Sequence, residues 1–292
     1  MSIDVLQEKI RKTKNPSVVD LALNLSDLPP HLTAREGFTA DAYGTFCCEL
    51  LEKLKGTVPA VRVSFTAFGI LGPRGLEEMI RVLAFAREQG YYVILEAPYV
   101  LSPMMAAGVA EAVFGEHAAY PCDGLILTVY PGSDVLKPFL PYVKGAQKDV
   151  FAVVRTSNKS APELQDLLTG SRLVYAAAAD LVNRYGADNA GKFAYARVGV
   201  LAGANNAQSL GALRSKYPRL FLLVDDMDYS GCNAKNCAQA FDRFGHGAAV
   251  CAGPDITMAW KTAETDGADY LEQAMDAADR MRKNLCRYVT IL

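Results

Sequence analysis

The chain has 292 residues, of which 51% are hydrophobic and 21% are charged, and its formal net charge is −2 at pH 7. This length can bury a large core, and this charge offers no basic surface of the kind that binds nucleic acid. No apolar run approaches the roughly 20 residues of a membrane span, and no apolar N-terminal segment precedes a cleavage site. We therefore expect a cytoplasmic protein without a nucleic-acid or membrane partner.

The cysteines favour the same compartment. There are seven, an odd number, and Cys47 and Cys48 are adjacent, which makes a disulfide framework a poor interpretation. Cys232 and Cys237 are separated by four residues rather than two, so a zinc knuckle is not indicated. Reduced, packed thiols are the expectation.

Strand and helix signals alternate along the whole chain. Residues 3–14 carry apolar side chains at helical spacing and are predicted to form a leading helix that closes one end of a barrel. Short apolar segments predict eight buried parallel strands, at residues 17–23, 60–65, 92–96, 124–129, 150–155, 198–202, 220–225 and 248–252. Further helices are predicted at residues 42–54, 74–89, 172–185, 206–216 and 274–287. This alternation predicts a single (β/α)8 TIM barrel domain over residues 1–292, with the last helix on its outside.

The stretch at residues 150–168 joins a strand to polar residues abruptly. After the apolar strand come Arg155, Thr156, Ser157 and Asn158, and Ser160 is placed to cap a helix that begins at Pro162-Glu163. The prediction is a strand, a polar loop and a helix. Barrels bind their ligands at the carboxyl ends of the strands, so this loop is expected beside the ligand.

The same stretch carries a specific resemblance. VFAVVRTSN followed by PELQDL is similar to the fifth strand and helix of the longer, bacterial-type orotidine 5′-phosphate decarboxylases. Other similar segments follow in order over nearly the whole chain: PSVVDLALNLSDLPP, AVRVSFTAFGILGPRGLEE, VILEAPYVLSP, DGLILTVYPGSDVLKPFL and RVGVLAGANN. The resemblance implies a TIM barrel, a homodimer and the conversion of orotidine 5′-phosphate to uridine 5′-phosphate in pyrimidine biosynthesis. It implies no metal and no cofactor.

The catalytic positions depart from the family pattern, which implies an Asp on strand one, a Lys on strand two and Asp-x-Lys-x-x-Asp at the end of strand three. This sequence has Ala22 and Arg62 at the first two positions and Glu96, Pro98 and Leu101 at the others. Arginine has too high a pKa to donate a proton readily, proline has no proton to give and leucine carries no charge. The electrostatic source of catalysis is therefore predicted to be lost.

The phosphate end departs in the same way. Where the family grips the phosphate after strand seven, this sequence has Asp225, Asp226 and Asp228, and Pro254 stands at the position of the family's Arg. Carboxylates repel a phosphate dianion, so a 5′-phosphate is not expected there. The backbone amide of Gly253 remains able to bind a less charged group.

Several polar side chains are still expected at the carboxyl ends of the strands, as candidate ligand contacts: Arg62, Glu96, Tyr99, Tyr130, Asp134, Arg155, Asn158, Asn205, Asn206, Asp225 and the amide of Gly253. Arg155 is interpreted either as a ligand anchor or as the partner of Glu96 in an ion pair. Glu96 with Asp225, Asp226 and Asp228 could hold a divalent cation, although adjacent acids are more often solvated turn residues. The apolar Leu101, Met104 and Met105 are interpreted as core or dimer-interface packing.

Three functions remain open at this point. The preferred one is a decarboxylase-like barrel that has lost the reaction and binds a small, nucleoside-like ligand or a protein partner, as a homodimer or as a mixed dimer with a catalytic relative. The first alternative is a divergent, active orotidine 5′-phosphate decarboxylase. The second is a metal-dependent enzyme that uses Glu96 and the aspartate cluster.

Overall fold

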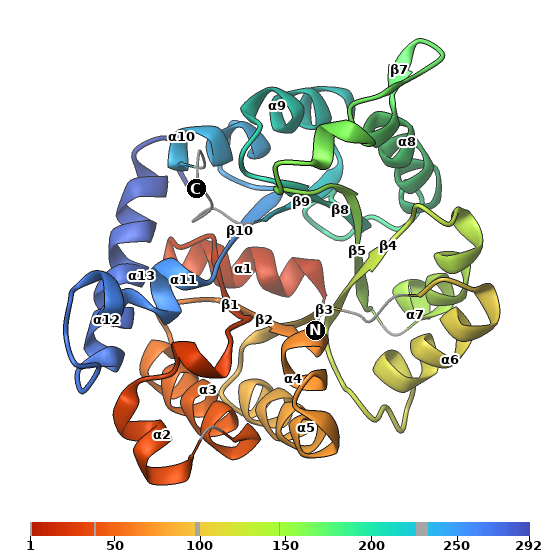
Figure 1. Cartoon of the computed structure of the whole chain (residues 1–292). Helices are drawn as coiled ribbons and strands as arrows, with labels where there is room; N and C mark the ends of the chain where they lie inside the picture. The colour runs from red at the N-terminus through yellow and green to blue at the C-terminus, as the bar shows by residue number, and fades with distance from the viewer. Residues whose placement is uncertain (1, 38, 97–99, 146, 226–232) are drawn as a thin grey trace.

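The structure is a computed structural model that describes residues 2–37, 39–96, 100–145, 147–225 and 233–292. Eight parallel strands close into a barrel in the order β1-β10-β9-β8-β5-β4-β3-β2 (Figure 1). They are β1 Ser17–Leu21, β2 Ala60–Ser64, β3 Tyr92–Glu96, β4 Gly124–Thr128, β5 Asp149–Arg155, β8 Ala196–Gly203, β9 Leu220–Asp225 and β10 Ala248–Ala252. The predicted (β/α)8 barrel is confirmed.

Helices surround this barrel on its outside (Figure 1). The longer ones are α3 Ala40–Leu54, α5 Gly72–Glu88, α6 Pro103–Phe114, α8 Val174–Gly186, α9 Ala207–Lys216 and α13 Tyr270–Cys286. The shorter ones are α2 Pro30–Glu36, α4 Phe65–Gly69, α7 Leu140–Gly145, α10 Ala234–Cys237, α11 Pro254–Thr257 and α12 Ala259–Thr262. Among the described residues, no helix combines the length and the apolar character that crossing a membrane requires.

One end of the barrel is closed by α1, Ile3–Thr13, which lies across the amino ends of the strands (Figure 1). Its buried residues Ile3, Leu6 and Ile10 recur every three to four positions, so one face of the helix packs on the barrel. We call this end the floor and the opposite end, at the carboxyl ends of the strands, the mouth. The predicted leading helix is confirmed.

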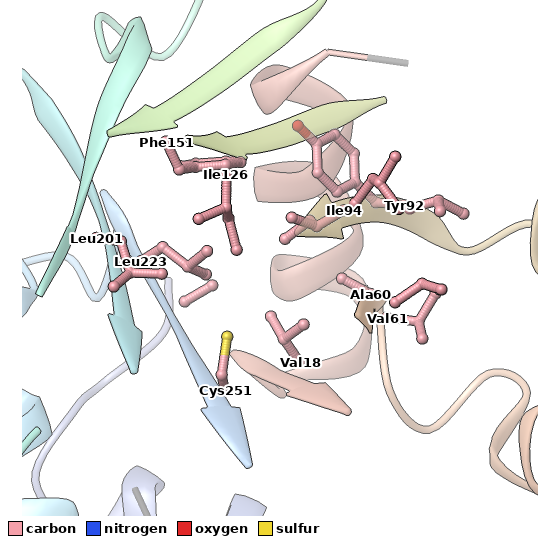
Figure 2. Close-up of a cluster of buried hydrophobic side chains, with 14 of the residues drawn as sticks. Val18, Ala60, Val61, Tyr92, Ile94, Ile126, Phe151, Leu201, Leu223 and Cys251 are labelled. Carbon is pink, nitrogen blue, oxygen red and sulfur yellow. The ribbon is translucent and has the colours of Figure 1, made fainter. Parts of the chain in front are cut away.

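The barrel interior is filled with apolar side chains. Figure 2 shows Val18, Ile94, Ile126, Leu201, Leu223 and Cys251 pointing toward one another from six different strands. All of them are at most 4% exposed. Interior packing of this kind is what a barrel of eight strands allows, so a ligand of the barrel itself would bind at the mouth.

The segment that follows β5 differs from the prediction. In place of an α-helix it forms a single 3-10 turn, Ala161–Glu163, and then a short antiparallel pair of β6 Leu168–Thr169 with β7 Arg172–Leu173. A helix here would need a buried apolar face, but Leu164, Leu167 and Leu168 are all more than half exposed. The turn between β6 and β7 uses Gly170 at φ +65°. Helix α8 therefore begins at Val174 rather than at residue 172.

Candidate functional site at the barrel mouth

The alternation of side chains along each strand builds the site. Val18 of β1 and Leu223 of β9 point into the barrel (Figure 2), so the residues two positions further on face the same way at the mouth. These residues are Asp20 and Asp225. Asp20 is directly opposite Arg62 in the parallel register of β1 and β2. Three charged side chains thus lie in the layer above the apolar core.

These three residues form a buried charge triad. Arg62 donates through Nη2 to Asp20 Oδ2 and through Nη1 to Asp225 Oδ1. Its side chain is 8% exposed, and those of Asp20 and Asp225 are 7% and 13% exposed. Burial opposes a charge on Arg62, but the two carboxylates outweigh burial and hold its pKa well above the ordinary value for arginine. Arg62 is therefore a permanent cation with one terminal nitrogen on each of the two carboxylates.

Arg155, at the end of β5, is the second buried cation of the mouth. It pairs with Asp166 through two hydrogen bonds of 3.0 Å, from Nε to Oδ1 and from Nη2 to Oδ2. Nη1 also donates to Asn205 Oδ1 at 3.2 Å. The partner of Arg155 is thus Asp166, and the predicted pair with Glu96 is wrong. A bidentate pair is the strongest form of this contact, so Arg155 anchors the loop that carries Asp166.

The same loop is fastened at a second point beside Arg155. The backbone N–H of Thr156 donates to Gln165 Oε1 at 2.8 Å, and Gln165 Nε2 donates to Thr156 Oγ1 at 2.9 Å. Gly203 of β8 lies against the loop so closely that an added Cβ would be 2.7 Å from Ser157 Cα. The polar residues 156–158 are therefore held in one place by their neighbours.

The remaining predicted ligand contacts are dispersed. Tyr130 donates to Val154 O at 2.7 Å, and burial raises its pKa to about 12. Asp134 is an exposed partner of Lys137. Asn158 is exposed and accepts from the Thr156 hydroxyl, while Asn206 caps α9 by accepting from Ser209 N. Tyr130 is 39% exposed and lies against the backbone near the end of β5, while Asp134 and Asn206 have structural partners that explain them.

Two of the family positions fall outside the barrel layer. Ala22 lies beyond the end of β1 at Leu21 and is exposed. Leu101 is 66% exposed, and the nearby Met104 and Met105 are 81% and 57% exposed. The core-packing interpretation of these three apolar side chains is therefore wrong, while their role in a dimer interface stays a prediction. Glu96 ends β3 and is half-buried.

Four other predicted residues, Pro98, Tyr99, Asp226 and Asp228, lie outside the described residues. Within the described part of the chain, no group of three or more His, Cys, Asp or Glu side chains is arranged to hold a metal ion. The described member of the aspartate cluster, Asp225, has its carboxylate on Arg62.

The end of β10 brings Gly253 against β1. A Cβ added at Gly253 would lie 3.6 Å from the Asp20 Cβ and 3.7 Å from its Oδ2. Pro254 begins the four-residue helix α11 and has no N–H to offer. An anion bound at this strand end would thus meet the carboxylate of Asp20.

Sequence reasoning missed Asp20 and Asp166. Asp20 could have been recognised as a site residue, because it is an acid inside the apolar strand sequence SVVDL, but its contact with Arg62 follows from the register of β1 and β2. Asp166 had no such signal, since it lies in a segment predicted to be a helix. The need of the buried Arg155 for a partner was evident, but the identity of that partner depends on the fold of the loop.

A closed parallel barrel with charged groups gathered at the carboxyl ends of its strands is the architecture that many enzymes share. Two solved structures have the same fold: the orotidine 5′-phosphate decarboxylase of Leishmania donovani has a TM-score of 0.72 at 22% identity and covers 97% of this chain and 100% of its own. That of Plasmodium berghei has a TM-score of 0.79 at 13% identity and covers 98% and 99%.

Sequence comparison names the relatives. The orotidine 5′-phosphate decarboxylase of Rhodopirellula baltica is 29% identical over 293 residues, which cover 96% of this chain and 97% of the relative. The enzyme of the same name from Clostridium perfringens is 27% identical over 286 residues, with 98% of each chain covered. No protein-family model matches. The chain is similar to orotidine 5′-phosphate decarboxylases along nearly its whole length, as its motifs predicted.

Proposed function

We propose that this barrel does not decarboxylate orotidine 5′-phosphate and instead binds a small, nucleoside-like ligand at its mouth. The observation that carries the proposal is the triad, in which Arg62 occupies the strand-two position between Asp20 and Asp225. The resemblance implies a lysine at that position. This chain thus combines the barrel fold of its relatives with a different set of charged side chains at the mouth.

The triad is unsuited to the reaction for a definite reason. A decarboxylation without a cofactor needs a group that protonates the carbanion and fixed charges that lower the barrier by much of the roughly 8–23 kcal/mol that enzymes supply. Arg62 holds its proton with a pKa well above the ordinary value, because its two carboxylate partners outweigh the effect of burial. Proton transfer from Arg62 is therefore strongly unfavourable.

No lysine on β2, β3 or β4 replaces Arg62. The sequence has none between Lys55 and Lys137. Lys55 precedes β2 and therefore lies toward the floor, whereas the reaction would take place at the mouth. Lys137 is 51% exposed and pairs with Asp134 at 2.9 Å.

The charge of the mouth indicates the class of ligand. Asp20, Asp225 and Glu96 lie at the strand ends with Arg62 as the cation of that layer, and Arg155 is neutralised by Asp166. Like charges in a poorly solvated site repel strongly, so a phosphate dianion is disfavoured. We therefore expect a neutral or cationic ligand, of the size of a nucleoside.

The test is a decarboxylation assay with orotidine 5′-phosphate, run beside the Clostridium perfringens relative, and a thermal-shift screen of orotidine and uridine against their 5′-phosphates. The proposal expects no release of CO2 above the uncatalysed rate and a larger shift for a nucleoside than for its phosphate. Turnover at the rate of the relative would overturn it in favour of a divergent decarboxylase. A shift for the phosphates alone would overturn the ligand class.

Location and assembly belong to the same proposal. We propose that the protein is cytosolic, which is supported by Cys47, Cys48 and Cys122, three buried cysteines that form no disulfide. We also propose a homodimer, or a mixed dimer with a catalytic relative, through the exposed Leu101, Met104 and Met105 near the start of α6. Light scattering of the wild type and of a Met104→Lys variant tests this: a monomeric wild type would contradict the homodimer, and co-purification with the relative measures the mixed form.

A further inference from the structure

A second candidate site lies at the floor, on the opposite end of the barrel from the mouth. A cavity of about 310 Å³ opens there between the end of α1 and the segments that lead into β2 and β3. Three lysines line it, Lys9 and Lys12 from α1 and Lys55 from the segment that follows α3. No Asp or Glu is among the residues that line it, although the chain as a whole has a net charge of −2.

The three ammonium groups are not equivalent. Lys9 donates to Gly90 O at 2.7 Å, which fixes its head at the cavity. Lys12 and Lys55 are exposed, and neither has a carboxylate oxygen within 4.0 Å among the residues that the structure describes. Two exposed lysines therefore line the cavity together with a third whose ammonium group is held by a hydrogen bond.

A simpler explanation accounts for only part of this arrangement. Helices α1, α3 and α5 end at Thr13, Leu54 and Glu88, close to the cavity, and lysines near a helix C-terminus stabilise its last carbonyl groups. Lys9 makes such a contact with the carbonyl that follows α5. Lys12 and Lys55 make none in the described structure, and both line a cavity large enough for a small molecule.

We propose that this floor pocket binds a phosphorylated small molecule. Its phosphate lies between the ammonium groups of Lys12 and Lys55, and its uncharged part lies against Pro59 and Tyr91, which also line the cavity. Lysine binds phosphate as a point charge, so two lysines that line one cavity suit a dianion. The site is independent of the proposed function and is separated from the mouth by the packed barrel interior (Figure 2).

The test uses inorganic phosphate and ribose 5-phosphate as probes, with calorimetry and NMR titration of the full chain at low ionic strength. Lys12→Gln and Lys55→Gln should each weaken binding about three- to tenfold, as expected for one charge-assisted contact at a partly exposed site. Raising the salt concentration from roughly 0.02 M to 0.5 M should weaken binding further, because it shortens the Debye length severalfold. Lys159→Gln removes an exposed lysine from the mouth side and should leave the affinity unchanged.

Two results would overturn the proposal: no binding by the wild type at millimolar probe, or binding that Lys159→Gln weakens as much as the two floor variants do. Because phosphate also stabilises proteins without binding, the melting temperature of each variant without probe is measured first. Both floor lysines are exposed, so the variants are expected to fold. Chemical-shift changes at Gly56 and Gly90, which line the cavity, would locate the probe at the floor.

Discussion

The triad makes its clearest prediction when its cation is removed. Arg62→Met replaces the guanidinium by an apolar side chain of similar length and leaves Asp20 and Asp225 in a site where their side chains are 7% and 13% exposed. Breaking a buried ion pair in this way typically costs about 3–5 kcal/mol. For a chain of this size that corresponds to a fall of roughly 5–8 °C in melting temperature near neutral pH.

The dependence of this loss on pH identifies its cause. Without Arg62, burial favours the protonated forms of the two carboxyl groups in the folded state. A group that binds its proton more tightly when folded contributes stability at low pH and loses that contribution as the pH rises. The difference in free energy of unfolding between wild type and Arg62→Met should therefore have its full size near about pH 7. It should decrease toward about pH 4, where the unfolded chain also takes up protons.

A matched variant separates charge from packing. The triple substitution Asp20→Asn, Arg62→Met and Asp225→Asn removes the charges together, so it should recover much of the stability that Arg62→Met loses. Thermal unfolding followed by circular dichroism from about pH 4 to 8 compares all three proteins. The reasoning is refuted if Arg62→Met is as stable as the wild type at neutral pH, or if its deficit does not change with pH.

Three further predictions concern residues around the barrel. Asp166→Asn should cost about 1–3 kcal/mol in urea unfolding, because it leaves its buried arginine partner short of a counter-charge, whereas Asp134→Asn at an exposed pair should change little; equal effects would contradict this. Burial raises the pKa of Asp149 well above its ordinary value despite its hydrogen bond with a tyrosine, so the wild type should lose stability as pH rises through that pKa and Asp149→Asn should not; parallel pH profiles of melting temperature would count against it. Gly203→Ala should destabilise by about 1–3 kcal/mol, since its Cβ would lie 2.7 Å from Ser157 Cα, and an unchanged melting temperature would show that the loop yields.

The strands were predictable because their physics is local. β3, β9 and β10 have the predicted bounds, since an apolar segment buried on both faces contrasts sharply with the polar residues that flank it. The segment after β5 was not predictable in the same way. Its leucines are spaced as in a helix, but no neighbouring element covers them, and a hairpin forms instead.

The candidate site was predictable only in part. Arg62, Arg155 and Asp225 were placed correctly at the strand ends, because position along a strand decides that. The partners of the two arginines were not predicted. The contact of Arg62 with Asp20 depends on the register between β1 and β2, and the contact of Arg155 with Asp166 depends on how a long loop folds back. The charge arrangement of the mouth therefore depends on contacts between residues that are distant in sequence.

The measurement that bears most directly on the account is the release of labelled CO2 from carboxyl-labelled orotidine 5′-phosphate by the purified chain. The charge arrangement around Arg62 predicts a rate no different from that of the buffer, both for the wild type and for Arg62→Lys, which restores only one of the altered positions. Rapid release by the wild type would contradict the claim that this barrel has given up the reaction of its relatives.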